Sequence, residues 1–98
     1  MAVISSLSMI AGTPAHVTIG DAAAGNAPLP NSQITWENLG VGIGLTITSD
    51  PAGGFVFSAT SPGIGTAVAA WTGVGGVIRL PALPITVTAT VMPVYLSP

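Results

Sequence analysis

The spacing of proline and glycine is the feature that most restricts how this chain can fold. Nine prolines and thirteen glycines interrupt its 98 residues at short intervals. Because proline ends a helix and glycine weakens one, these positions leave no room for a long helix. Between them lie short runs in which apolar and polar side chains alternate, which is the pattern of a β-strand with one buried face. The sequence therefore predicts an all-β protein.

Six runs carry this alternation and predict which side chains face a core. They are residues 15–19 (AHVTI), 33–38 (QITWEN), 45–48 (LTIT), 55–59 (FVFSA), 66–72 (TAVAAWT) and 85–91 (ITVTATV). The predicted inward residues are Ala15, Val17, Ile19, Ile34, Trp36, Leu45, Ile47, Phe55, Phe57, Ala59, Ala67, Ala69, Trp71, Ile85, Val87, Ala89 and Val91. Turn signals such as Asp50-Pro51 separate the runs about every ten residues, as in a two-sheet sandwich. We expect one domain over residues 1–98, a sandwich of about 6–8 antiparallel strands.

Three segments fit the strand pattern less well and supply the candidate interface. Residues 1–10 (MAVISSLSMI) are too apolar for a free tail, so we expect either a first strand or an arm that docks on a neighbouring subunit. Residues 74–84 (VGGVIRLPALP) are expected to form a long apolar loop, and residues 92–98 a short tail. Exposed apolar segments mark contact surfaces. The candidate interface residues are Ile4, Leu7, Met9, Ile78, Arg79, Leu80, Val94, Tyr95 and Leu96.

Charge is nearly absent from this chain. Asp21, Glu37, Asp50 and Arg79 are the only formally charged residues and make up 4% of the chain, against about 25% in a typical soluble domain. A surface with so little charge favours a protein that is covered in part by partner subunits. Arg79 has two readings: a surface residue with its stem on apolar neighbours, or an anchor for a carboxylate of a neighbouring subunit.

Composition also excludes several classes of partner. One arginine and no lysine cannot neutralise several phosphates, so nucleic-acid binding is not expected. No run of 18 apolar residues occurs, so no membrane-spanning helix is expected, and residues 1–15 lack the basic start of a signal peptide. The chain has no cysteine, which removes disulfides and thiolate metal sites.

The residues that could carry chemistry form no recognisable constellation. His16 is the only imidazole, no G-x-S-x-G pattern accompanies it, and its place in the alternation predicts a solvent-facing or interface side chain. The three carboxylates are scattered, which favours neither a glycosidase pair nor a calcium site. The glycine clusters at residues 40–44 and 73–76 lack the lysine of a phosphate-binding loop and predict permissive backbone. We therefore expect a protein that is not an enzyme and has no catalytic, cofactor-binding or metal-binding residues.

Four short motifs occur in a recognisable order between Pro30 and Val91. They are Ile34-Thr35-Trp36, Asp50-Pro51, Gly65-Thr66-Ala67-Val68-Ala69 and Ile85-Thr86-Val87-Thr88. In this order the chain resembles the bacterial immunoglobulin-like (Big-type) domains of phage virion proteins and surface adhesins, over about two-thirds of its length. It departs from them where Glu37-Asn38-Leu39 replaces the usual Ser-Ser-Asp run, and in the longer apolar segment before the last strand. The resemblance implies an immunoglobulin-like sandwich that serves as a rod, spacer or binding module and has no catalytic residues.

Taken together, these features favour a virion structural protein. We expect a capsid decoration or cement protein whose partners are capsid or tail proteins, or further copies of itself in a homo-oligomer. A single domain that starts at Met1 without a secretion signal fits this function better than a module of a long adhesin. Two alternatives stay open: a cell-surface or extracellular recognition module that binds carbohydrate or protein, and a self-assembling tail or fibre component.

Overall fold

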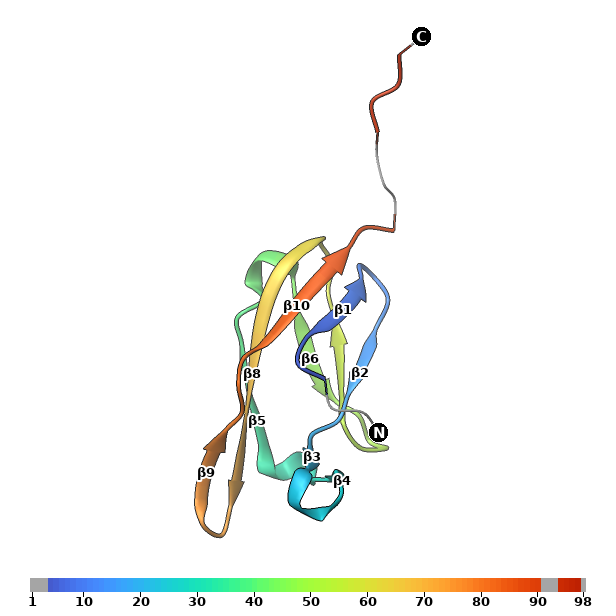
Figure 1. Cartoon of the computed structure of the whole chain (residues 1–98). Helices are drawn as coiled ribbons and strands as arrows, with labels where there is room; N and C mark the ends of the chain where they lie inside the picture. The colour runs from blue at the N-terminus through green and yellow to red at the C-terminus, as the bar shows by residue number, and fades with distance from the viewer. Residues whose placement is uncertain (1–3, 91–93, 98) are drawn as a thin grey trace.

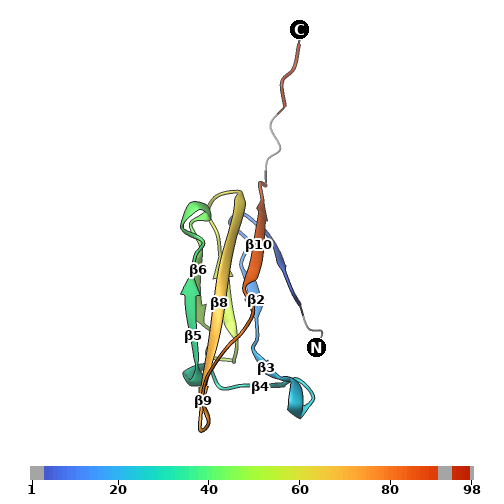
Figure 2. The same ribbon diagram turned by 60° about the vertical axis from the view of Figure 1, so that its left-hand side comes forward.

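The protein is a sandwich of two β-sheets. The computed structural model describes residues 4–90 and 94–97, and in these residues it contains strands and three short 3-10 helices but no α-helix. A five-stranded sheet and a three-stranded sheet enclose the hydrophobic core, and a small two-stranded hairpin lies at one end (Figures 1 and 2). The prediction of an all-β sandwich is confirmed.

The larger sheet has the strand order β1-β10-β8-β5, with β9 beside β8. Its strands are β1 (Leu7–Ile10), β5 (Ile34–Asn38), β8 (Gly63–Gly73), β9 (Gly76–Arg79) and β10 (Leu83–Thr88). The long strand β8 pairs with β5 along one edge and with β10 and then β9 along the other. All of these pairs are antiparallel except β1–β10, which is parallel. The expectation of a purely antiparallel sandwich is therefore wrong at this one pair.

The smaller sheet has the order β2-β7-β6 and is antiparallel throughout. Its strands are β2 (Ala15–Val17), β6 (Thr46–Ser49) and β7 (Phe55–Ser58). The hairpin of β3 (Gly20–Asp21) and β4 (Ala27–Pro28) follows β2, with the 3-10 helix η1 (Ala22–Ala24) between its strands. The other 3-10 helices are η2 (Asn31–Gln33), before β5, and η3 (Val41–Ile43), after it.

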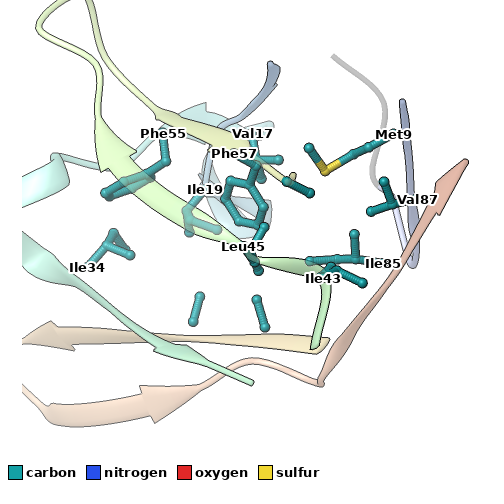
Figure 3. Packing of buried hydrophobic residues seen from close by; sticks show 13 residues of the cluster. Met9, Val17, Ile19, Ile34, Ile43, Leu45, Phe55, Phe57, Ile85 and Val87 are labelled. Carbon is teal, nitrogen blue, oxygen red and sulfur yellow. The ribbon is translucent and has the colours of Figure 1, made fainter. Parts of the chain in front are cut away.

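The core forms where the inner faces of the two sheets meet (Figure 3). Its buried residues are Met9, Val17, Ile19, Ile34, Ile43, Leu45, Phe55, Phe57, Ala59, Ala67, Ala69, Ile85 and Val87. All of these except Met9 and Ile43 were predicted from the alternation, which succeeds because successive side chains of a strand point to opposite faces. The predicted inward residues Ala15, Trp36, Ile47 and Trp71 are only partly buried and pack against this cluster.

The segment from residue 74 to residue 84 is not the long loop that the sequence suggested. Strand β9 folds back on β8 in a tight hairpin, with Gly73 opposite Gly76 and Ile78 opposite Trp71. Gly76 has a φ of +117°, which glycine adopts at no steric cost. All four residues of β9 are exposed, so neither face of the strand is buried and no alternation appears in its sequence. This strand is defined by its backbone pairing with β8, which cannot be predicted from the hydrophobic pattern of its sequence.

Residues 7–10 of the N-terminal segment form a strand of the larger sheet. Leu7 lies opposite Ile85 and Ile10 opposite Thr88, so β1 covers part of the edge of β10. Met9 points into the core and is only 4% exposed. Its place in the candidate interface was therefore wrong, because a side chain buried in its own core has no surface to offer a partner. Residues 1–3 of the predicted arm or strand, Val91 of the predicted last strand, and residues 92, 93 and 98 of the predicted tail lie outside the described residues.

Candidate docking groove between the sheets

One long side of the sandwich is only partly closed. Strand β1 pairs with β10 from Ile85 onward, so within the described residues no strand lies beside Leu83 and Pro84 on that edge. Across the opening, β2 is the edge strand of the smaller sheet and pairs only with β7. Between β9 and β10, residues 80–82 belong to no strand. The two sheets therefore leave an opening between two unpaired edges, beyond the start of β1.

An apolar groove of about 440 Å³ occupies this opening. This volume lies within the range of about 300–1,000 Å³ that is usual for ligand sites. The inner part of its lining consists of core and core-facing side chains: Val17, Ile19, Trp36, Ala69, Leu80 and Leu83. Ile4, Pro81 and Ala82 form part of its outer rim, and all three are exposed. A partner that enters the groove would contact a mainly apolar lining that contains no charged side chain.

Trp36 forms part of the lining of this groove and carries an unusual polar atom. Its ring packs edge-on against Phe55 and Phe57, with centroids 5.5 and 5.0 Å away. Its indole Nε1–H is buried and has no acceptor among the described residues. The other tryptophan, Trp71, donates its Nε1–H to Gln33 Oε1 at 2.9 Å. The two tryptophans therefore differ, since Trp71 is hydrogen-bonded within the chain and Trp36 makes packing contacts only among the described residues.

The structure separates the residues that the sequence grouped into one interface. Ile4 and Leu80 both line the groove, Ile4 with 49% of its surface exposed. Leu7 is partly buried and packs against the core. Ile78 and Arg79 lie on β9, while Val94, Tyr95 and Leu96 follow the last strand and are exposed. Trp36 and Ala69 were missed because inward-facing residues of strands predict a core rather than an opening, and Leu83 was missed because it fell in the expected loop.

Arg79 has its partner within the chain. Its Nη2 donates to Glu37 Oε1 at 3.3 Å, across the outer face of the larger sheet. The side chains are 64% and 52% exposed, and pairs of this kind contribute about 0–1 kcal/mol. Nothing in the sequence linked the two residues, because the β5–β8–β9 order that brings them together is tertiary.

His16 stands on the outer, polar side of β2, as the alternation predicted, with its side chain 49% exposed. Its Nε2–H donates to Gly53 O at 2.8 Å and lies 3.3 Å from Asp50 Oδ2. Both neighbours are acceptors, so the hydrogen resides on Nε2. Asp50 also accepts a hydrogen bond from Ala52 N at 2.9 Å. These contacts tie β2 to the β6–β7 turn, which is a structural role for the histidine.

Asn31 holds the same turn from the other side, and its removal should weaken the fold. Its Nδ2 donates to Gly54 O at 2.7 Å and its Oδ1 accepts from Gly54 N at 3.0 Å. Both bonds are partly buried, so we expect Asn31→Ala to lower the free energy of unfolding by about 1–2 kcal/mol. Urea denaturation measures this, with the exposed neighbour substitution Ser32→Ala as control. Equal unfolding midpoints for the two variants would contradict the role of Asn31.

Among residues 4–90 and 94–97, no group of three or more His, Asp or Glu side chains is placed to hold a metal ion. In the same part of the chain no helix is long and apolar enough to cross a membrane. A scan against protein-family models, a search of curated proteins and a search of solved structures each found no match to this chain.

Proposed function

We propose that this chain is a non-enzymatic structural subunit of a larger protein assembly, and that the assembly is a phage virion whose capsid it decorates. The observation that carries the proposal is the amount of exposed apolar surface on a domain with four formal charges. The large apolar side chains exposed in the described residues are Ile4, Ile10, Leu39, Val41, Ile64, Val74, Val77, Ile78, Val94, Tyr95 and Leu96. Contact with other subunits would remove this surface from water.

The strand order supports the immunoglobulin-like assignment on which the virion setting rests. Leaving out the short β3–β4 hairpin and the extension β9, seven strands remain, which correspond in chain order to strands A to G of an immunoglobulin constant domain. Strands β2, β7 and β6 then form the B-E-D sheet, and β5, β8 and β10 the C-F-G sheet. The first strand differs, because β1 lies beside the last strand instead of beside the second.

The recognition-module alternative receives less support from the side chains. A carbohydrate site of that kind needs exposed aromatic rings, and both tryptophans are partly buried and pack against the core. Tyr95 is the one fully exposed aromatic side chain among the described residues, and it lies in the segment after β10 rather than on a sheet face. The apolar groove and exposed aliphatic residues favour protein partners over glycans.

The mass of the purified protein in solution tests the proposal. Light scattering over a concentration series should show species heavier than the 9.6 kDa chain, with mass rising with concentration. Because the surface carries few charges, that mass should change little when salt is raised from low to high concentration. A chain that stays monomeric and highly soluble at millimolar concentration would contradict the proposal.

A further inference from the structure

We propose that the groove binds residues 94–96 (Val94-Tyr95-Leu96) of a second copy of this chain, which add a strand along the free edge of β2. The inference rests on the proposed function and deepens it, because it names the partner and the two surfaces that meet. Each copy then offers one groove and one donor segment, which is a head-to-tail contact.

The groove suits an extended apolar segment. Its inner lining is apolar, and β2 presents backbone N–H and C=O groups that, among the described residues, no strand pairs on the side away from β7. An added strand uses such an edge for main-chain hydrogen bonds and places alternate side chains in the pocket. The opposite edge of the opening is less suitable, because Pro84 in β10 has no N–H to donate. The free edge of β2 is therefore the binding edge.

The donor segment is chosen by elimination among the exposed apolar residues. Val94, Tyr95 and Leu96 are 73%, 107% and 87% exposed and belong to no strand. The other exposed apolar residues are less suitable as donors. Ile10, Ile64, Val77 and Ile78 already lie in paired strands, Leu39 and Val41 lie at η3, Val74 is a single residue in the turn between β8 and β9, and Ile4 lines the groove itself. In an extended conformation Val94 and Leu96 share one face and Tyr95 takes the other. This segment can therefore add a strand to a second copy without breaking any strand pairing in its own chain.

The donor segment comes from a second copy because its own groove lies at the wrong end of the strand that precedes it. Strand β10 runs from Leu83, at the groove, to Thr88, where the chain leaves the sandwich. Residues 94–97 then lie beyond that end and away from the two sheets (Figures 1 and 2). A return path to the groove would have to pass over β1, which already occupies the edge of β10. Docking in another copy needs no such reversal.

Two variants that each remove one half of the contact test this pairing. The donor variant carries Val94→Asp and Leu96→Asp, and the groove variant carries Ala82→Glu on the exposed rim. Each alone should need at least about thirtyfold more protein to reach half-assembly in light scattering, as expected for the loss of an interface hot spot. Ser97→Asp and Ala52→Glu each place one negative charge at an exposed position outside the contact and should assemble like the native chain.

Mixing the two variants gives the decisive result. The donor variant keeps an intact groove and the groove variant an intact donor segment, so an equimolar mixture should form a dimer and stop there. In a Trp71→Phe background, the fluorescence of Trp36 in the groove should shift as that dimer forms. A mixture that stays monomeric, or single variants that assemble like the native chain, would overturn the inference.

The outcomes also separate this inference from the proposed function. If the native chain assembles and both variants assemble equally well, the groove contact is wrong while the assembly proposal stands. If the native chain itself is monomeric at millimolar concentration, both fail. Circular dichroism and the melting temperature verify that each variant is folded, and Pro81→Glu, also on the exposed rim, replaces Ala82→Glu if that variant does not fold.

Discussion

Replacing Phe57 by alanine is expected to lower the free energy of unfolding by about 3–5 kcal/mol. Phe57 has 0% of its surface exposed and lies at the centre of the core, where its ring meets that of Trp36 edge-on at 5.0 Å. Alanine would leave a cavity between two sheets that are held apart by their other side chains, so the site cannot fully collapse. The total free energy of unfolding of a small domain is about 5–15 kcal/mol, so this variant would be close to unfolding.

Urea denaturation followed by tryptophan fluorescence measures the effect, at a protein concentration too low for assembly. Val56→Ala is the matched control on the same strand, because Val56 faces outward and is only partly buried. Val56→Ala should lower the free energy of unfolding clearly less than Phe57→Ala does, since fewer buried carbon atoms are lost. Similar unfolding midpoints for the two variants would mean that β7 does not present Phe57 to the core.

The substitution Gly65→Ala, which adds a single methyl group, is expected to lower the free energy of unfolding by about 1–3 kcal/mol. Gly65 lies in β8 where the loop that contains η3 crosses the sheet. A Cβ there would stand 2.7 Å from Ile43 Cδ1 and 3.1 Å from the Cα of Gly40. Ile43 is 1% exposed, so its side chain and the backbone of Gly40 would have to shift within a packed core to admit the methyl group. Gly65→Ala should therefore strain the contact between β8 and the η3 loop.

Gly42→Ala is the control, because an added Cβ at Gly42 has nothing within 4 Å. The two substitutions change the entropy of the unfolded chain in the same way, so their difference reports the steric effect in the folded state. We expect Gly42→Ala to be neutral or to raise stability by about 0.4–1 kcal/mol. Thermal unfolding of both variants measures the difference, and equal melting temperatures would rule out close packing at Gly65.

The strands with one buried face could be located from the sequence, while those without one could not. The alternation in residues 55–59 and 85–91 identifies Phe55, Phe57, Ile85 and Val87 as core residues, and all four are buried. Strand β9 escaped detection because it is exposed on both faces. The observed strands also differ by a few residues from the predicted runs, as in β8, which begins at Gly63 rather than at residue 66. Glycine carries no side chain that could reveal a pattern there.

The groove could not be predicted as an opening, although Val17, Ile19, Trp36 and Ala69 of its lining could be placed on the inner face of a strand. An inward side chain lines a core when the facing sheet covers it and a groove when that sheet ends too early. Trp36 is an example, since the alternation places it inward but only the short β1 and the break at residues 80–82 leave an opening beside it. The sequence did indicate the exposed residues Val94 to Leu96 and, on the groove side, Ile4 and Leu80.

The all-β class, most of the core and the near absence of charge could be derived from the amino-acid sequence, because each of these follows from residue type and local spacing. By contrast, the parallel pairing of β1 with β10, the burial of Met9 and Ile43 and the contact between Arg79 and Glu37 became known from the folded structure. These features depend on contacts between residues far apart in the chain. Local alternation shows which face of a strand is apolar, but the choice of neighbouring strand is made by the whole sandwich as it packs.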